Sequence, residues 1–180
     1  MLPPLVTALF LSAVSAFSVA EARASEWWPY DNPHFGYSIE LPPGFGTTVV
    51  SDRKDGLALA PADRSATLLV FATPGLDSSF SREAETRLAL AKQDGWRVSY
   101  SKMTPQGFSY TGVRRERIVY GRGVALCNGA SAFFQMDYAK SDMQRYDAVV
   151  MRLVRSLKST AKCVGGGTKQ PFRNSLAATG

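Results

Sequence analysis

The dipeptide Asn128-Gly129 constrains the fold more than any other feature of the sequence. Asn-Gly favours a two-residue turn with positive φ at both positions, and this turn joins two antiparallel strands. Mainly apolar sequence flanks the dipeptide on both sides, over residues 117–127 and 130–138. We therefore predict a long β-hairpin, and with it an antiparallel sheet.

A two-residue turn also fixes which residues of the hairpin face one another. It would place three pairs in register: Cys127 with Ala130, Gly123 with Phe134, and Gly121 with Met136. Because side chains alternate across a strand, the glycines would share one face with the large side chains of the return strand. This pattern is typical of a sheet face that packs beneath a helix.

The last regular element that the sequence predicts is an amphipathic helix over residues 142–158. Its apolar residues lie on one side of the helical wheel, and its arginines lie on the other. Ser141 and Gln144 have the spacing of a capping box at its start. A helix of this length, antiparallel to the return strand, would bring its C-terminal end back toward the hairpin turn.

The chain has two cysteines, Cys127 beside the predicted turn and Cys163 just beyond the predicted helix. The returning helix would bring them together, and two cysteines in an oxidising compartment typically form a disulfide. We therefore predict a Cys127–Cys163 disulfide. A nucleophilic cysteine would instead need a neighbouring base, and the single histidine, His34, lies in a turn-rich segment before the first predicted strand.

Other candidate catalytic and metal sites lack the spacing that their chemistry requires. Two cysteines and one histidine supply at most three soft ligands, without the usual zinc spacings. Ser109 lies in G-x-S-x-x-G rather than the G-x-S-x-G of a nucleophile elbow. The "GGGTK" sequence near the C-terminus lacks the preceding strand of a phosphate loop. We predict no catalytic residue, no metal and no cofactor.

The remaining sequence predicts short strands and one more helix. Strands are indicated at residues 35–41, 56–61, 65–73, 96–103 and 107–113. The segment before Gly95 predicts a helix, with Phe80, Ala84, Leu88 and Ala91 on one apolar stripe. Ser78, Ser79 and Ser81 are its candidate N-caps. We expect a single domain over residues 25–163.

The first 24 residues have the pattern of a secretory signal peptide. An apolar, uncharged run over residues 5–20 is short for a membrane span and precedes the small-x-small sequence Ala22-Arg23-Ala24. We predict cleavage near Ala24 and a periplasmic or secreted protein without a membrane span in its mature chain. The alternative is a leader retained as an anchor. Residues 164–180 predict a disordered tail.

The net charge of +6 limits the partners that the chain would meet. Because an exported basic protein encounters anionic envelope surfaces rather than nucleic acid, we expect no nucleic-acid partner. The last helix carries the candidate contacts to an anionic lipid or glycan: Arg145, Arg152, Arg155 and Lys158. A predicted turn adds Arg114, Arg115 and Arg117. The alternative is that both sets simply form solvated surfaces.

The order of several motifs resembles the PsbP/DcrB-like superfamily over residues 28–160. These motifs are "YDNPHFGYSIELPPGF", "GWRVSYSK", "GFSYTG", "FFQMDYAKSDMQRYD" and the closing "VVMRLVRSL". The chain is most similar to small exported bacterial members. The resemblance implies an α+β fold in which an antiparallel sheet has helices on both faces, an α/β/α sandwich. The resemblance implies no active site, because the shared motifs are structural. The chain also lacks the lipoprotein cysteine of some envelope members.

Three classes of function are consistent with these features. The first is a non-catalytic exported envelope protein that docks to a protein partner through a sheet edge or a helix face. The second is a binding module for an anionic lipid or glycan, and the third, without positive support, is a hydrolase with an unrecognised site. An uncovered strand on a flat surface would favour the first class, whereas a deep apolar pocket would favour small-ligand binding.

Overall fold

The computed structural model describes residues 26–75 and 79–160. The predicted leader, Cys163 and the predicted tail lie outside these residues. The cleavage site, the disordered tail and the boundaries of the domain therefore stay predictions.

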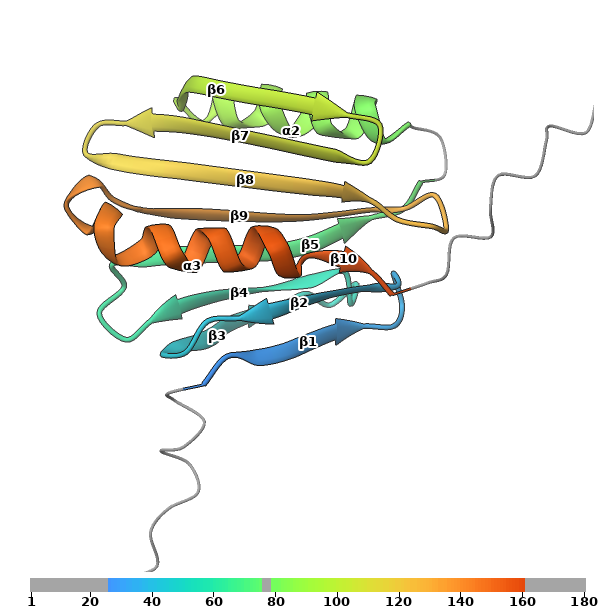
Figure 1. Ribbon diagram of the computed structural model, residues 1–180, viewed down its shortest axis with the longest axis horizontal. Coiled ribbons are helices and arrows are strands. Elements are labelled where there is room, and N and C mark those ends of the chain that lie inside the picture. Colours follow the sequence, from blue (N-terminus) through green and yellow to red (C-terminus); the bar gives the residue numbers. More distant parts are fainter. Residues whose placement is uncertain (1–25, 76–78, 161–180) are drawn as a thin grey trace, which may run out of the picture.

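The described chain forms ten strands, two α-helices and a short 3-10 helix (Figure 1). The strands are β1 (Trp28–Asn32), β2 (Tyr37–Leu41), β3 (Phe45–Val50), β4 (Gly56–Pro61), β5 (Ala66–Thr73), β6 (Arg97–Thr104), β7 (Gly107–Arg114), β8 (Arg117–Ala125), β9 (Ser131–Ala139) and β10 (Lys158–Ser159). The helices are α2 (Phe80–Gln93), η1 (Lys140–Asp142) and α3 (Met143–Ser156).

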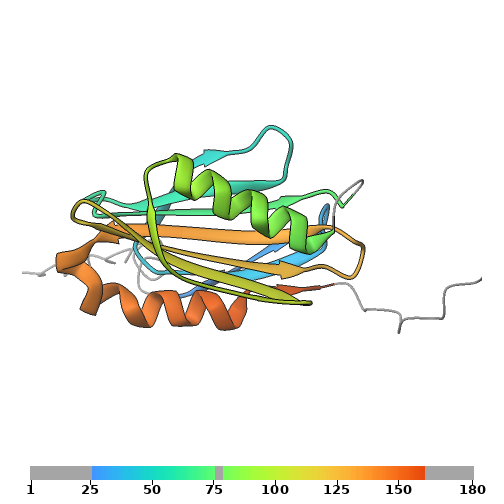
Figure 2. The same cartoon turned by 90° about the horizontal axis from the view of Figure 1, so that it is seen from above.

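Seven strands form one sheet in the order β3-β4-β5-β9-β8-β7-β6, and every neighbouring pair is antiparallel. A second, three-stranded sheet has the order β1-β2-β10. The two α-helices lie on opposite faces of the large sheet, and the small sheet lies on the same side as α3 (Figure 2). The predicted α+β sandwich with an antiparallel sheet between helices is confirmed.

Two hydrophobic clusters hold these layers together. On the α3 side, Tyr146, Val150 and Leu153 of the helix pack with apolar residues of β2, β3, β4, β5, β8 and β9. On the α2 side, Ala84 and Ala91 pack with aromatic and aliphatic residues of β5 to β9 and with Trp96. None of the residues in the α2-side cluster comes from β3 or β4. Each helix therefore covers only part of its sheet face.

The first helix forms as its apolar pattern predicts. Ala84 and Ala91 are buried, and Phe80 and Leu88 pack partly buried against the same cluster. Ser79 is the N-cap, where its side chain accepts a hydrogen bond from the backbone N–H of Arg82, 3.3 Å away. Gly95 follows the helix with a φ of 84°, the left-handed conformation that suits glycine at this position.

The predicted capping box of the last helix is wrong. The N-cap of α3 is Asp142 and makes no side-chain cap hydrogen bond, because residues 140–142 first form the 3-10 helix η1. The helix also ends earlier than predicted, at Ser156, and β10 follows it. The residues after the helix thus add a strand to β2 instead of extending α3.

The predicted hairpin forms, but its register is shifted by one residue. The turn has three residues instead of two: Leu126 pairs with Ala130, and Gly129 alone has a positive φ of 84°. This is a type I turn followed by a left-handed residue, the next most common hairpin connection. Gly123 therefore faces Phe133, and Gly121 faces Gln135.

This one-residue shift moves the glycines to the other face of the sheet. Phe134, Met136 and Tyr138 of β9 lie beneath α3 as buried residues, whereas Gly121 and Gly123 face the α2 side. Large side chains still pack over the glycines, as the sequence predicts, although the rings come from other residues. The ring of Tyr110 lies over Gly121, and the ring of Phe133 lies over Gly123.

Three strands, β1, β3 and β10, were not predicted from the sequence, and each has a weak pattern. β1 contains Pro29, which disfavours a strand, and β10 has only two residues. β3 carries polar and exposed residues along most of its length. These strands lie at the edges of their sheets or complete the small sheet.

The end of the described chain returns to the turn that carries Cys127. The backbone N–H of Cys127 donates to the hydroxyl of Ser159 at 3.4 Å, and the N–H of Thr160 donates to the carbonyl of Gly36 at 2.9 Å. The side-chain amide of Asn128 donates to the carbonyl of Phe35 at 3.0 Å. The chain thus comes back to Cys127 three residues before Cys163, which supports the predicted disulfide without testing it.

We predict that Gly121→Ala destabilises the protein. A methyl group at this position would overlap the Tyr110 ring, which is buried and is held by a 2.7 Å hydrogen bond to Gln135. Overpacking of this kind costs about 1–3 kcal/mol, measurable by denaturant unfolding. The matched control is Gly46→Ala on β3, where a methyl group meets no atom within 4 Å. Equal unfolding free energies for the two variants would contradict this packing.

We also predict that Cys163→Ser lowers the free energy of unfolding of the oxidised protein by about 3–4 kcal/mol, because a disulfide would close a loop of about 36 residues. The double variant with Cys127→Ser should lose no more than the single variant. Intact-mass analysis after alkylation tests the bond independently, because it counts the free thiols. Alkylation of both thiols in the folded, oxidised protein would rule the bond out.

Candidate binding groove beside the last helix

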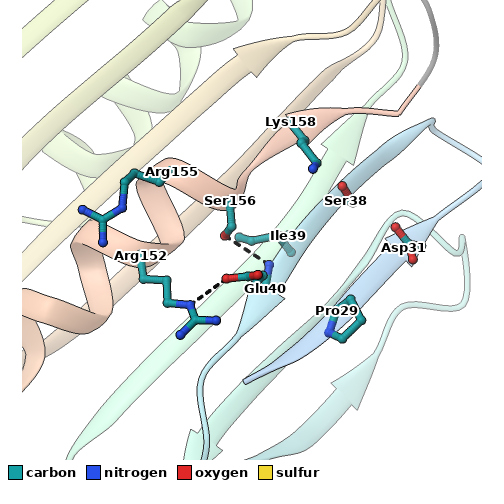
Figure 3. Close-up of a pocket in the computed structure, with 9 residues that line it drawn as sticks. All are labelled: Pro29, Asp31, Ser38, Ile39, Glu40, Arg152, Arg155, Ser156 and Lys158. Atoms are coloured by element: carbon teal, nitrogen blue, oxygen red, sulfur yellow. Dashed lines mark hydrogen bonds and ion pairs between the residues drawn. The ribbon is translucent and has the colours of Figure 1, made fainter. Parts of the chain in front are cut away.

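A shallow groove of about 550 Å³ runs between α3 and the small sheet (Figure 3). It brings together three of the four predicted contacts to anionic surfaces. Its lining residues are Pro29, Asp31, Ser38, Ile39, Glu40, Arg152, Arg155, Ser156 and Lys158.

The local fold explains why the basic residues meet β2 at this place. Val150 and Leu153 are buried, and Arg152 and Arg155, three residues apart, lie together on one side of the helix, where Arg152 is half-buried and Arg155 is exposed. The pairing of β10 with β2 then sets Lys158 directly opposite Ser38. The groove is therefore a consequence of how the amphipathic helix and the small sheet share one core.

Arg152 is held in place by two partners. Its Nε donates to the Glu40 carboxylate at 2.6 Å, and its guanidinium lies 4.5 Å from the ring centre of Trp27. The backbone N–H of Glu40 donates to the Ser156 hydroxyl at 3.1 Å. The hydrogen bond from Arg152 holds the pKa of Glu40 below its usual value. Arg152 therefore links α3 to β2 and to the first described residues of the chain.

Arg145 lies outside this groove and is also engaged. Its Nη1 donates to Asp63 at 3.2 Å, and its guanidinium lies 5.0 Å from the ring centre of Tyr146. The Ser65 hydroxyl donates to the other oxygen of Asp63 at 2.7 Å. Because this uses the only hydroxyl proton of Ser65, the Tyr146 hydroxyl donates to Ser65 across 2.6 Å. The start of α3 is thus tied to the turn between β4 and β5.

Arg155 and Lys158 are exposed, and no ion pair to either of them occurs within residues 26–75 and 79–160. They do not converge on one point, because Glu40 and Ser156 lie between them in Figure 3. Asp31 and Glu40 add two negative charges to the lining. The four predicted residues therefore separate into two that form ion pairs and two that are available to a ligand.

The acidic partners of Arg145 and Arg152 were not predicted from the sequence. Glu40 and Asp63 lie more than 80 residues before the arginines that they bind, and no local spacing connects them. One signal was available, because Asp63 and Ser65 have the spacing of an Asx turn, in which Asp63 also accepts the Ser65 backbone N–H at 3.1 Å. Trp27, which lies over Arg152, packs partly buried against the α3-side core.

The histidine and the buried tyrosines, whose side chains could take part in catalysis, lie outside the groove. His34 is exposed in the turn between β1 and β2 and meets the Phe35 ring edge-on at 4.8 Å. This turn lies beside the turn that carries Cys127. The sequence did not predict that the two turns are neighbours. Burial raises the pKa of Tyr37, and it raises the pKa of Tyr110 to about 12, so both phenols stay protonated. The described part of the chain gathers no three His, Cys, Asp or Glu side chains that could hold a metal ion.

None of the helices within the described ranges is long and apolar enough to span a membrane.

We predict that the carboxyl of Asp63 titrates with a pKa of about 2, held low first by the Ser65 hydroxyl and then by the Ser65 N–H and Arg145. A folded-state pKa below the unfolded value of about 3.9 stabilises the protein above pH 4, and this contribution is lost as the pH falls from about 4 to 2. Ser65→Ala should raise the pKa, as measured by NMR titration. Ser101→Ala, on the distant strand β6, is the control. A wild-type pKa near 3.9 would contradict the hydrogen bonds to Asp63.

Comparison with known proteins finds similarity only in structure. No protein-family model matches the sequence, and no curated protein matches it. Cyanobacterial PsbP (CyanoP) from Synechocystis sp. PCC 6803 is similar to this chain with a TM-score of 0.57 and 11% sequence identity. The match covers 83% of this chain and 98% of CyanoP.

A second solved structure is LpqN of Mycobacterium tuberculosis, which is involved in cell envelope biogenesis. It has a TM-score of 0.45 and 14% identity, and the match covers 82% of this chain and all of LpqN. Of these two matches, the one to CyanoP is close enough to identify the architecture. On that match, and on the sheet between two helices, this chain has the PsbP-like α+β sandwich fold.

Proposed function

We propose that this chain is a non-catalytic exported envelope protein that docks to a protein partner through the β3 edge of its large sheet. The observation that carries this proposal is that β3 ends the sheet as an exposed strand without charged residues. Export rests on the signal-peptide pattern of residues 1–24.

The outer part of β3 is open to solvent. Its residues from Gly46 to Val50 are exposed, and Val49 and Val50 have 60% and 68% of their surface accessible. Two exposed aliphatic side chains at the end of an edge strand, next to unpaired backbone groups, form a template for another strand. Strand addition of this kind gives affinity through main-chain hydrogen bonds and specificity through side-chain pockets.

The opposite edge of the sheet is better protected. β6 carries Arg97 and Lys102, and its pairing with β7 is interrupted by a bulge between Val98 and Tyr100. Charged residues and bulges are the usual protection of an edge strand against pairing. β3 also has a bulge, between Thr47 and Val49, but it has no charge, and Val49 and Val50 pair regularly again with β4. The two edges therefore differ most in charge.

A small apolar hollow next to β3 gives the added strand a specific contact. It measures about 180 Å³, and Val49, Leu57, Ala58, Leu69 and Phe71 supply its apolar lining. It is close to the volume of one large aliphatic or aromatic side chain. We therefore infer that the partner supplies an extended, uncharged segment with an apolar side chain that enters this hollow.

We predict that Val49→Lys abolishes partner capture. Purified mature protein would be incubated with envelope extract, and cross-linking mass spectrometry would identify the captured protein and the segment bound beside residues 45–50. A lysine next to the hollow should reduce capture at least about tenfold, because a charge opposes strand pairing.

The matched control is Tyr100→Lys on the other edge, where the side chain is 49% exposed. It should leave capture unchanged. Both positions are at the surface, so unfolding free energies should stay within about 0.5 kcal/mol of the wild type. Loss of capture by Tyr100→Lys alone, or equal capture by all three proteins, would overturn the docking of a partner at β3.

A further inference from the structure

A second surface, at the far side of the sheet from β3, concentrates arginines around the β7–β8 hairpin. The hairpin turn consists of Arg115 and Glu116, and it places Arg114 directly opposite Arg117. A broad hollow beside the turn is lined by Asp94, Gly95, Arg97, Val113, Arg114, Arg115, Glu116 and Arg117. Trp96 and Val98 both pack on the α2 side, so Arg97 between them points to the other face of the sheet. We refer to Arg114, Arg115 and Arg117 as the arginine cluster.

Two members of the arginine cluster are fixed by other groups. Arg117 donates through Nε to a carboxylate oxygen of Asp137 at 2.6 Å and through Nη2 to the Asp137 carbonyl at 3.1 Å. Arg114 donates to the carbonyl of Asp94 at 2.8 Å, and its guanidinium lies 4.4 Å from the ring centre of Trp96. Trp96 is buried, so the ring is a rigid support.

These contacts leave an excess of positive charge. Like charges directly opposite each other on paired strands destabilise a sheet, and only Arg117 has a carboxylate to offset this. Arg114 and Arg115 form no ion pair within the part of the chain that the structure describes. Glu116, the acidic residue of the turn, pairs with Lys140 at 3.4 Å. The hollow thus has two guanidinium groups, those of Arg114 and Arg115, that lack an acidic partner.

We propose that this hollow binds a terminal phosphate group, one that can carry two negative charges. A guanidinium presents a planar fork of N–H donors that matches phosphate oxygens, and a dianion would offset the repulsion between Arg114 and Arg117. Prior fixation of Arg114 on Trp96 lowers the entropy lost on binding. The groove beside α3 is a weaker candidate, because its two available cations do not converge. The group can come from free phosphate or from a phosphorylated lipid headgroup.

The first test titrates inorganic phosphate into the oxidised full chain at low ionic strength. The assigned indole N–H resonance of Trp96 reports binding in NMR spectra, because this ring supports Arg114. We expect a saturable shift, and a dissociation constant at least about tenfold weaker for Arg114→Gln. Arg115→Gln is a second variant, at an exposed position in the turn.

The control is Arg82→Gln on the exposed side of α2, which should bind phosphate like the wild type. The proposal is overturned if phosphate causes no saturable shift. It is also overturned if Arg82→Gln weakens binding as much as Arg114→Gln and Arg115→Gln do.

The second test separates the two sources of the phosphate group. Vesicles that contain phosphatidic acid present a monoester, whereas vesicles with phosphatidylglycerol at matched surface charge present a diester. Preferential, Arg114-dependent binding to phosphatidic acid vesicles indicates a lipid headgroup, and binding of inorganic phosphate without vesicle binding indicates a free ligand. Equal binding to both vesicles that does not depend on Arg114, together with no binding of inorganic phosphate, would overturn the site. The β3 edge is at the opposite side of the sheet, so either proposal can fail without the other.

Discussion

The burial of one face of β9 beneath α3 is the constraint on which the rest of the structure depends. β9 is hydrogen-bonded to β5 on one side and to β8 on the other, and its residues Phe134, Met136 and Tyr138 are buried. Full burial of a large apolar side chain contributes about 1.5–3 kcal/mol. Because Tyr146, Val150 and Leu153 complete this core, the direction of α3 is fixed, and with it the return of the chain to β2 and to the Cys127 turn.

The two helices cover different parts of the large sheet, and this arrangement defines the two surfaces that we assign to binding. α2 packs over strands β5 to β9 on one face, and α3 with the small sheet packs over β3, β4, β5, β8 and β9 on the other. On β3 only Phe45 is buried, so the rest of this edge strand is exposed, next to an apolar hollow. The arginine cluster lies at the other side of the sheet, where a tight hairpin sets two arginines opposite each other.

Hydrophobic periodicity made the helices and the central strands predictable from the sequence, since their burial follows local patterns. The predicted hairpin register differs from the observed one by one residue. The reason is that Asn-Gly also suits a three-residue turn in which only Gly129 is in the left-handed conformation. β3 was missed because an exposed edge strand carries no alternating pattern. Arg145 and Arg152 were identified as basic surface residues, but their partners Asp63 and Glu40 are distant in sequence and follow from the tertiary fold.

Hydrogen–deuterium exchange, followed for single amides, tests most directly whether β3 is an open edge beside a rigid central sheet. The account predicts that amides of β5, β8 and β9 exchange most slowly, through global unfolding, and that the outward-facing amides of β3 exchange as fast as those of β6. Protection of the β3 amides equal to that of β9, in the dilute isolated protein, would show that this strand is already covered. That result would contradict the docking surface.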